Sequence, residues 1–420
     1  MEEFYKIRDP IYGFITFDEW EREIINHPVF QRLRRIRQLA LTDMVYPGAT
    51  HTRFEHSLGV MHLATNMYDA ITKNDKNLGK LEGILNYKEI GIERNRRLIR
   101  LAALLHDIGH APFSHAGEEI MPKKEGDVSY KHEDYTTHII LNELKDVIED
   151  HNINKSNYKI TAKDIVILLS GKSDDINNVF WFPLLSSQLD ADRSDYLLRD
   201  SYYAGVKYGI YDIQRLLATL SIGMDAETKE NEILIVIDES GWHVAESIVI
   251  ARYQMFSQVY FHKTRNAFDK ILEFALKDCL ENRTLPEPEN TQEYLDFDDF
   301  KCWQMFKDKV SQSEWCEFIV NRNPLRVVAE TKEFYGEQNN NFEEKARKLE
   351  NAGIFFWKDE ANRGKDWYKL DEEIFILNKN DKTEPLSEYS VIAKNLGKSN
   401  QKRIYVKPED KEKAEKLLLY

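Results

Sequence analysis

Apolar residues recur at helical spacing along most of the chain up to residue 280. Near the N-terminus, Phe30, Leu33 and Ile36 fall on one side of a helix, and arginines and glutamines fall on the other. Further helices are predicted at residues 58–71, 101–105, 165–169, 190–202 and 242–280. The pattern therefore predicts a mainly α-helical core.

Strand signals are short and few. A Pro/Gly turn between β-branched and aromatic residues at 7–15 predicts a hairpin or loop, and 232–238 is the strongest strand pattern. After residue 322, short apolar and aromatic runs alternate with charged residues. We therefore expect a helical core with a small β excursion over 1–322, a polar surface insertion at 73–97, and an α+β lobe over 323–420.

Composition and charge narrow the class of protein. The 420 residues carry a formal net charge of −14, so the chain lacks the basic charge of a general nucleic-acid binder. Its three cysteines show neither CxxC pairing nor the spacing of a disulfide framework, which fits a reducing compartment. The N-terminus has no apolar signal region, and no run approaches the roughly 20 apolar residues that span a bilayer. We expect a soluble cytoplasmic protein with no membrane or nucleic-acid partner.

Potential metal ligands gather where the apolar run 101–105 ends. His106 and Asp107 are adjacent there, and two more histidines follow shortly after. Candidate partners lie on both sides along the chain, at His56 and Asp192. Two histidines and two carboxylates suit a divalent cation that prefers nitrogen and oxygen ligands.

Two charged segments have more than one interpretation. In 190–200, Asp192, Tyr196 and Asp200 are spaced so that they share one helix face, yet the segment alone also fits a charged surface helix. Four arginines lie between residues 32 and 37. They indicate either a solvated helix face or a patch that faces phosphate.

Four motifs in order resemble those of the HD superfamily and, within it, of the dNTP triphosphohydrolases. They are residues 53–60, 105–115, 132–133 and 190–200. The similarity starts at Asp9 and extends through Asn323, with a fainter echo in the last segment. It implies that the helical core is an HD domain.

The resemblance also implies a role for each matching residue. One divalent metal, with Mn, Fe, Ni, Zn and Mg not distinguished, would be held by His56, His106, Asp107 and Asp192. Catalytic roles would fall to His110, His132, His115 and Glu118. Substrate-binding roles would fall to Gln38, Arg53, Arg193, Tyr196, Asp200, Arg252 and Tyr260. The arginines would contact phosphate, Asp200 and Gln38 the 3′-hydroxyl, and the tyrosines would crowd C2′ against a ribose.

The implied reaction converts a dNTP and water into a deoxynucleoside and inorganic triphosphate, with Mg²⁺ accompanying the nucleotide. Relatives are often tetramers that nucleotides activate between subunits, so we expect a homo-oligomer, either a tetramer or a dimer. Gln31 and Arg34 match that activating site, whereas Asn26 replaces an Asp that reads guanine. We therefore expect an activating nucleotide other than a guanine nucleotide, or none.

Two other functions stay open from the sequence. Another HD phosphohydrolase, such as a nucleotidase or a phosphodiesterase, would need the same metal ligands. A nucleic-acid-binding or regulatory protein with a vestigial HD site is the second alternative. The complete retention of the metal ligands together with His110 and His132 argues against the second.

Overall fold

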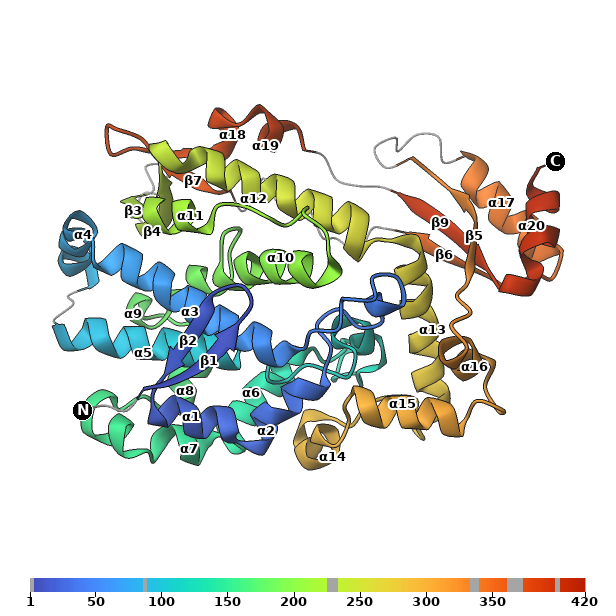
Figure 1. Cartoon of the computed structure of the whole chain (residues 1–420), viewed down its shortest axis with the longest axis horizontal. Helices are drawn as coiled ribbons and strands as arrows, with labels where there is room; N and C mark the ends of the chain where they lie inside the picture. The colour runs from blue at the N-terminus through green and yellow to red at the C-terminus, as the bar shows by residue number, and fades with distance from the viewer. Residues whose placement is uncertain are drawn as a thin grey trace.

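The computed structural model describes residues 4–85, 89–224, 233–332, 340–360, 373–396 and 401–419. Over these residues the chain is mainly α-helical and carries three small sheets (Figure 1). This confirms the predicted fold class. In this part of the chain, no helix is long and apolar enough to cross a membrane.

The predicted hairpin opens the chain. β1 (Tyr5–Asp9) pairs antiparallel with β2 (Gly13–Phe17), and the Asp9 carboxylate accepts two backbone hydrogen bonds within the turn. Asp18 then caps α1 (Glu19–Asn26) through its side chain. The chain therefore enters the helical core directly from the hairpin.

Two long helices form the centre of the core. α3 (Arg53–Thr72) and α5 (Glu89–Leu105) pack against each other, and most of their described side chains are buried (Figure 1). α10 (Ala191–Ala204) crosses α3 so closely that a Cβ on Gly59 would lie 2.1 Å from Asp195 Oδ1. Because glycine has no side chain, α10 can bring its carboxylates to the first turns of α3.

The other helices of the core surround this centre. They are α2 (Pro28–Gln31), α4 (Asp75–Leu85), α6 (His132–Asn142), α7 (Lys145–Glu149), α8 (Ala162–Ser170), α9 (Ile176–Val179), α11 (Ile213–Thr219), α14 (Thr291–Leu295), α15 (Asp299–Asp308) and α16 (Glu314–Val320). Short single turns connect several of them. Helix α6 matters most for the site, because His132 is its first residue.

The stretch predicted as a surface insertion, 73–97, is helical where it is described. It contains α4 and the first half of α5, and residues 86–88 lie outside the described part of the chain. Arg97 is buried and pairs with Asp18 at 2.6 Å. Asn95 and Arg97 are therefore part of the core instead of a surface excursion, and the ion pair of Arg97 interrupts the apolar pattern there.

The predicted long helix 242–280 is interrupted. α12 (Trp242–Met255) continues into a π turn at 256–260, and α13 (Lys263–Cys279) starts after it in a new direction (Figure 1). Such π turns are frequent at functional sites, because the extra residue per turn re-aims side chains. Here the turn ends at Tyr260, which lines a cavity between the helices of the core.

The C-terminal segment forms a small α+β lobe at one end of the molecule (Figure 1). Its antiparallel sheet has the order β5 (Arg326–Glu330), β9 (Lys402–Val406), β6 (Phe356–Glu360). α17 (Asn340–Asn351) and α20 (Lys411–Leu418) pack on it. The lobe has its own small apolar cluster, separate from the main core.

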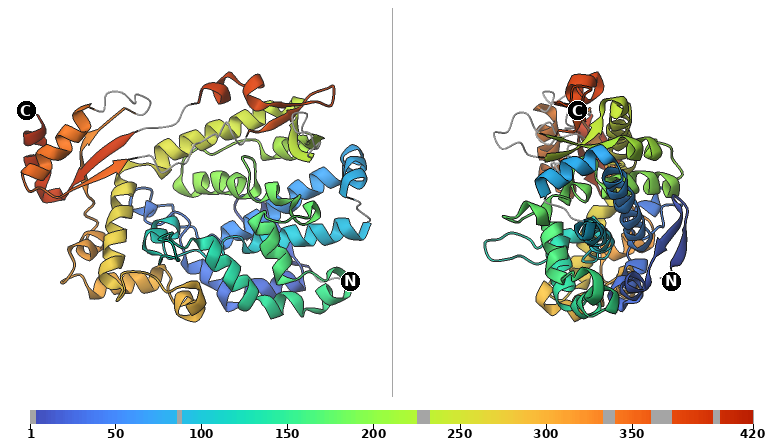
Figure 2. Two further views of the ribbon diagram at one scale, coloured as in Figure 1. Left: turned by 180° about the vertical axis from the view of Figure 1, so that it is seen from behind. Right: turned by 90° about the vertical axis from the view of Figure 1, so that its left-hand side faces the viewer.

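Part of the same segment returns to the helical core. A second sheet has the order β3 (Leu220–Met224), β4 (Ile233–Asp238), β7 (Phe375–Leu377), β8 (Thr383–Pro385), and β4 pairs with β7 in parallel. α18 (Leu386–Tyr389) and α19 (Val391–Asn395) then lie along α12 (Figure 2). Residues 373–396 therefore complete the predicted β excursion instead of extending the lobe.

Candidate active site

A cavity of about 1030 Å³ opens between α3, α6, α10, α12 and the turn that follows α5. It gathers most of the residues that the sequence singled out. Those on its wall are Gln38, Arg53, His106, Asp107, His110, His115, His132, Asp192, Arg193, Tyr196, Asp200, Arg252 and Tyr260. Segments far apart in the sequence therefore meet at one site.

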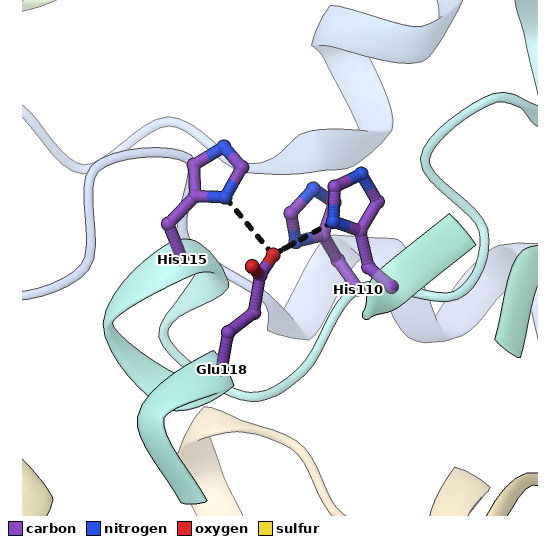
Figure 3. Close-up of side chains that lie close together, drawn as sticks. His110, His115 and Glu118 are labelled. Atoms are coloured by element: carbon purple, nitrogen blue, oxygen red, sulfur yellow. Dashed lines mark hydrogen bonds and ion pairs between the residues drawn. The ribbon is translucent and has the colours of Figure 1, made fainter. Parts of the chain in front are cut away.

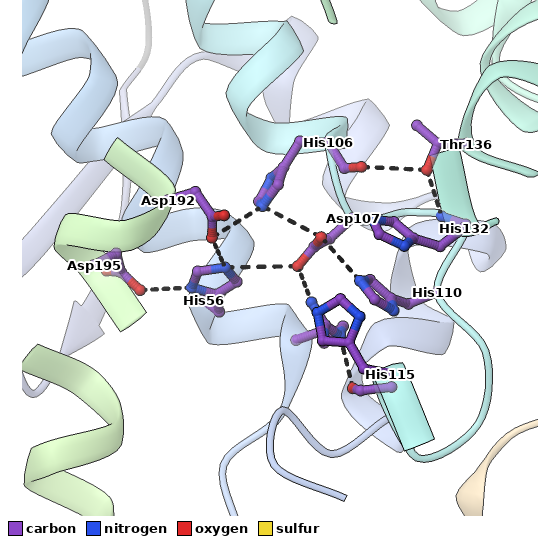
Figure 4. A network of polar contacts seen from close by, with 12 residues as sticks. His56, His106, Asp107, His110, His115, His132, Thr136, Asp192 and Asp195 are labelled. Atoms are coloured by element: carbon purple, nitrogen blue, oxygen red, sulfur yellow. Dashed lines mark hydrogen bonds and ion pairs between the residues drawn. The ribbon is translucent and has the colours of Figure 1, made fainter. Parts of the chain in front are cut away.

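The four predicted metal ligands converge at one end of the cavity (Figure 4). His56 Nε2 lies 3.0 Å from Asp192 Oδ1 and 3.6 Å from Asp107 Oδ2. His106 Nε2 lies 3.4 Å from Asp107 Oδ1 and 3.7 Å from Asp192 Oδ1. Two imidazole nitrogens and two carboxylates thus face a common centre.

Both imidazole rings are oriented by their other nitrogen. His56 Nδ1 is 2.7 Å from Asp195 Oδ2, and His106 Nδ1 donates to the Ala103 carbonyl at 2.8 Å. This leaves Nε2 of each ring for the centre, and His106 Nε2 is buried with no hydrogen-bond partner among the described residues. Metal-bound histidines are held in this way, so the donor set fits a divalent cation.

The charges at this centre also call for a cation. Burial raises the pKa of Asp107, but Arg53, His106 and His110 together outweigh it and hold that pKa well below its usual value. Burial lowers the pKa of His56, yet its hydrogen bonds to Asp192 and Asp195 raise the pKa to about 10. Two ionised carboxylates therefore need a positive charge between them, either a proton on His56 or a metal ion.

Beside the ligands lies a second group of three histidines around one carboxylate (Figure 3). Glu118 Oε1 is 2.7 Å from His132 Nδ1, 2.9 Å from His115 Nδ1 and 3.7 Å from His110 Nδ1. The His110 and His132 rings stack with centroids 3.8 Å apart and planes 15° apart. His110 Nε2 reaches Asp107 Oδ1 at 3.3 Å, which connects this group to the ligands.

The two stacked rings have opposite proton preferences. Burial lowers the pKa of His132, but the Glu118 carboxylate outweighs it and raises that pKa above its usual value. Burial and the nearby Arg53 together lower the pKa of His110 far below its usual value. A protonated His132 thus lies against a neutral His110, which is an arrangement for moving a proton.

The same four side chains lie close enough together to hold a second cation. The hydrogen bonds argue against it, because the Nδ1 atoms of His132 and His115 are already engaged by Glu118 Oε1 at 2.7 and 2.9 Å. We therefore interpret His110, His115, His132 and Glu118 as an acid–base group.

The backbone turn that carries His110 is fixed by residues that do not line the cavity. A Cβ on Gly109 would lie 2.2 Å from the Thr136 nitrogen and 2.4 Å from the His132 oxygen, so α6 starts directly against the turn. Arg32 is buried and donates to the His110 carbonyl at 2.9 Å. Tyr294 donates to the Gly109 carbonyl at 2.7 Å.

Replacing Gly109 by Ala should displace the start of α6 and lower both turnover and stability. A Cβ so close to backbone forces a shift, and overpacking of this kind costs about 1–3 kcal/mol of unfolding free energy. The measurement is a denaturant titration with kcat on the same preparation. Gly79→Ala is the matched control, since nothing lies within 4 Å of its added Cβ. Equal behaviour of the two variants would contradict the expectation.

The predicted phosphate-binding arginines each have a protein partner that fixes them. Arg53 donates to Ser114 Oγ at 2.7 Å and pairs with Asp107. The other two are fixed in the same way, Arg193 by Asp190 at 2.9 Å and Arg252 by Gln188 at 2.8 Å. The guanidinium groups are therefore oriented before any ligand binds.

The predicted sugar-binding residues lie together on another part of the wall. Tyr260 donates its hydroxyl proton to Asp200 Oδ2 at 2.5 Å, and its ring meets that of Tyr196 edge to face at 6.1 Å. Gln38 Oε1 is buried and has no hydrogen-bond partner among the described residues. This wall thus offers a carboxylate, an amide and two aromatic faces.

The predicted activator residues lie outside the cavity. Arg34 donates to Gln31 Oε1 at 2.9 Å and stacks over Phe54 at 3.4 Å. The neighbouring arginines also have protein partners, with Arg35 on Asp298 and Arg37 on Asp43. Arg34 and Arg35 are exposed, as on a solvated face, whereas Arg32 is buried, so the four arginines do not share one environment.

Several residues that shape the site were missed from the sequence. They are His51, Ser114, Gln188, Asp190 and Asp195, all of which orient a predicted site residue. Asp195 follows Asp192 by three positions on the same helix, which was a usable signal. Asp190 likewise precedes Arg193 by only three positions. The other three are visible only once distant segments are brought together.

Asp195→Asn should weaken metal binding about 10- to 100-fold, because losing the carboxylate that orients a metal-bound histidine has that effect. The measurement is the metal dissociation constant, by competition with a chromophoric chelator. Asp9→Asn is the matched control, since Asp9 shares the Arg199 guanidinium with Asp195 but does not touch His56. An unchanged constant for Asp195→Asn would refute the orienting role.

Two protein-family models match this chain. A family model for the HD domain matches residues 53–176, and one for the HD-associated region matches residues 211–352. An uncharacterised Bacillus subtilis protein, YwfO, is 30% identical over 98% of this chain and 96% of its own length. The chain belongs to the HD-domain family.

Two further relatives of this HD-domain protein carry functional names. The deoxynucleoside triphosphate triphosphohydrolase SAMHD1 homolog of Dictyostelium discoideum is 29% identical, and the match covers 77% of this chain but 60% of that protein. A solved phosphohydrolase structure from Bacteroides thetaiotaomicron is 26% identical, with a TM-score of 0.70 over 96% of this chain and 100% of that one. The HD-domain protein is accordingly a phosphohydrolase whose histidine and aspartate cluster suits a divalent metal.

Proposed function

We propose that this HD-domain protein is a dNTP triphosphohydrolase, which converts a dNTP and water into a deoxynucleoside and inorganic triphosphate. One observation carries the proposal. Three oriented arginines, Arg53, Arg193 and Arg252, line the same cavity as the proposed metal ligands and the proposed sugar-binding residues. Three guanidinium groups match the charge of a triphosphate better than that of a monophosphate.

In this proposal His56, His106, Asp107 and Asp192 would hold the metal, which would supply polarisation of the α-phosphate and a more acidic water. The arginines neutralise the charge of the triphosphate in the ground and transition states. Water attacks the α-phosphorus, the bond to O5′ breaks, and His132 donates a proton to O5′. The Glu118 carboxylate, hydrogen-bonded to His132 Nδ1, stabilises the protonated form of His132.

The sugar wall would select a 2′-deoxynucleotide. Asp200 accepts a hydrogen bond from the 3′-hydroxyl, and the Gln38 amide nitrogen donates one to the hydroxyl oxygen. Tyr196 and Tyr260 occupy the space beside C2′, where a ribose carries its extra hydroxyl. An added hydroxyl against two aromatic rings is disfavoured by both size and desolvation, by about 100-fold.

We further propose that a nucleotide activates the protein at Gln31 and Arg34 between subunits of a homo-oligomer. Both side chains lie at the surface and outside the cavity, where a second copy could cover them. Activity that appears only in nucleotide mixtures, together with a larger species on size-exclusion chromatography, would support this.

The test is incubation with each dNTP and with GTP, singly and in mixtures, with Mg²⁺ or Mn²⁺ present. Ion-pair chromatography resolves the products. Deoxynucleoside with triphosphate is the expected result. Monophosphate with pyrophosphate, or turnover of nucleoside monophosphates or phosphodiesters, would instead identify another HD phosphohydrolase. Absence of turnover with a full metal site would favour a regulatory protein.

A further inference from the structure

His51 lies behind the sugar wall, in the loop that leads into α3. Its side chain is fully buried and does not line the cavity. Nε2 lies 2.7 Å from Asp200 Oδ1, and the ring stacks on Tyr203 with centroids 4.6 Å apart and planes 12° apart. The side chain is therefore fixed in one orientation with its nitrogen on a cavity carboxylate.

The backbone of the same residue holds the other side of the wall. The Gln38 backbone nitrogen donates to the His51 carbonyl at 3.1 Å, and the neighbouring Arg53 nitrogen donates to the Ile36 carbonyl at 2.9 Å. These bonds tie the segment that carries Gln38 to the loop that carries His51. One residue thus contacts both groups that are proposed to bind the 3′-hydroxyl.

We infer that His51 is a positioning residue for the sugar: it orients Asp200 through its side chain and Gln38 through its backbone, and so sets selectivity for a 3′-hydroxyl. The inference rests on the proposed function, because it needs a nucleotide in the cavity. It adds a residue that does not itself touch substrate.

The hydrogen-bonding capacity of the three side chains supports this role. His51 Nδ1 is buried and has no hydrogen-bond partner in the described part of the chain, so the ring proton belongs on Nε2, where it is donated to Asp200. Tyr260 donates to the other carboxylate oxygen. Held from both sides, the carboxylate cannot rotate, and its remaining lone pairs can only accept a donor such as a hydroxyl.

A merely structural role for His51 predicts something different. If the ring only filled space between α3 and α10, its loss would affect every substrate alike. A positioning role acts through the 3′-hydroxyl alone. Comparing a dNTP with the matching 2′,3′-dideoxynucleotide separates the two, because these nucleotides differ in that one group.

The experiment measures kcat/KM for dATP and 2′,3′-dideoxy-ATP in wild type, His51→Phe and His51→Gln. His51→Phe keeps the stacking ring and loses the donor. We expect it to lower kcat/KM for dATP about 10- to 100-fold, as loss of a hydrogen bond to a charged group does, while the dideoxynucleotide changes little. His51→Gln places an amide donor near the same position and should restore most of the preference.

His151→Phe is the matched control. His151 also stacks on an aromatic ring, that of Trp20, but does not line the cavity. It should leave the preference for dATP unchanged. If His51→Phe fails to fold, His51→Asn replaces it, since its amide falls one methylene short of the Gln amide and should lose the preference that Gln keeps.

Equal loss for both nucleotides in His51→Phe, or an equal preference in the Asn and Gln variants, would overturn the inference. Failure of the proposed function looks different. In that case wild-type protein would release triphosphate from neither nucleotide, and the positioning role would fall with it.

Discussion

Asp107→Ala is expected to abolish turnover, with a loss of at least about a thousandfold in kcat, and to leave the protein with less than stoichiometric metal. Asp107 contributes both of its oxygens, one toward each ligand histidine, and also pairs with Arg53. Its loss removes a ligand and leaves a buried guanidinium without its anion. Elemental analysis of purified protein and turnover on the same sample measure both effects.

The unpaired guanidinium could also destabilise the fold, so two variants separate the causes. Asp107→Asn keeps the shape and one acceptor for Arg53 but removes the negative charge, and it should lose metal while staying folded. Asp18→Asn removes a different buried carboxylate, the partner of Arg97, away from the cavity. It should retain metal and activity. Full activity with empty metal sites in either Asp107 variant would refute the metal-dependent account.

His132→Gln should lower kcat by about 100- to 10,000-fold with little change in KM, the range expected when a general acid is removed. His132 is a proton donor only while protonated, and Glu118 raises its pKa. Activity in the wild type should therefore persist through neutral pH and fall as pH rises through that raised pKa. The pH dependence of kcat measures this directly.

Glu118→Gln tests the cause of that pKa. Removing the carboxylate leaves burial to lower the His132 pKa, so the alkaline limb of the pH profile should move to lower pH. Glu133 and Asp107 also face His132 and raise its pKa, but less. Glu133→Gln is the matched control. The exposed Glu133 Oε2 lies 3.4 Å from His132 Nδ1, so its loss should shift the alkaline limb less. An alkaline limb that stays in place in Glu118→Gln would exclude His132 as the acid.

The four metal ligands could be predicted from the sequence as one group, but not the geometry that brings them together. Adjacent residues on a helix point about 100° apart, which made the His106-Asp107 pair a weak signal by itself. α5 ends at Leu105, so both residues lie in the turn beyond the helix and can face one centre. Motif order placed the four ligands in one group, and the end of the helix explains how they meet.

The residues that could not be predicted from the sequence act mainly through contacts between segments far apart along the chain. His51 and Asp200 are 149 positions apart, and His56 and Asp195 are 139 apart. No spacing rule connects such pairs. Buried ion pairs such as Arg97 with Asp18 likewise hid the first half of α5, because their charges resemble those of a surface.

Hydrolysis of a dNTP in ¹⁸O-labelled water shows which bond of the nucleotide is cleaved. If water attacks the α-phosphorus and the bond to O5′ breaks, the products are an unlabelled deoxynucleoside and inorganic triphosphate with ¹⁸O on a terminal phosphorus. Mass spectrometry of the two products locates the label. Release of a nucleoside monophosphate with pyrophosphate, or ¹⁸O in the deoxynucleoside, would contradict the proposed cleavage.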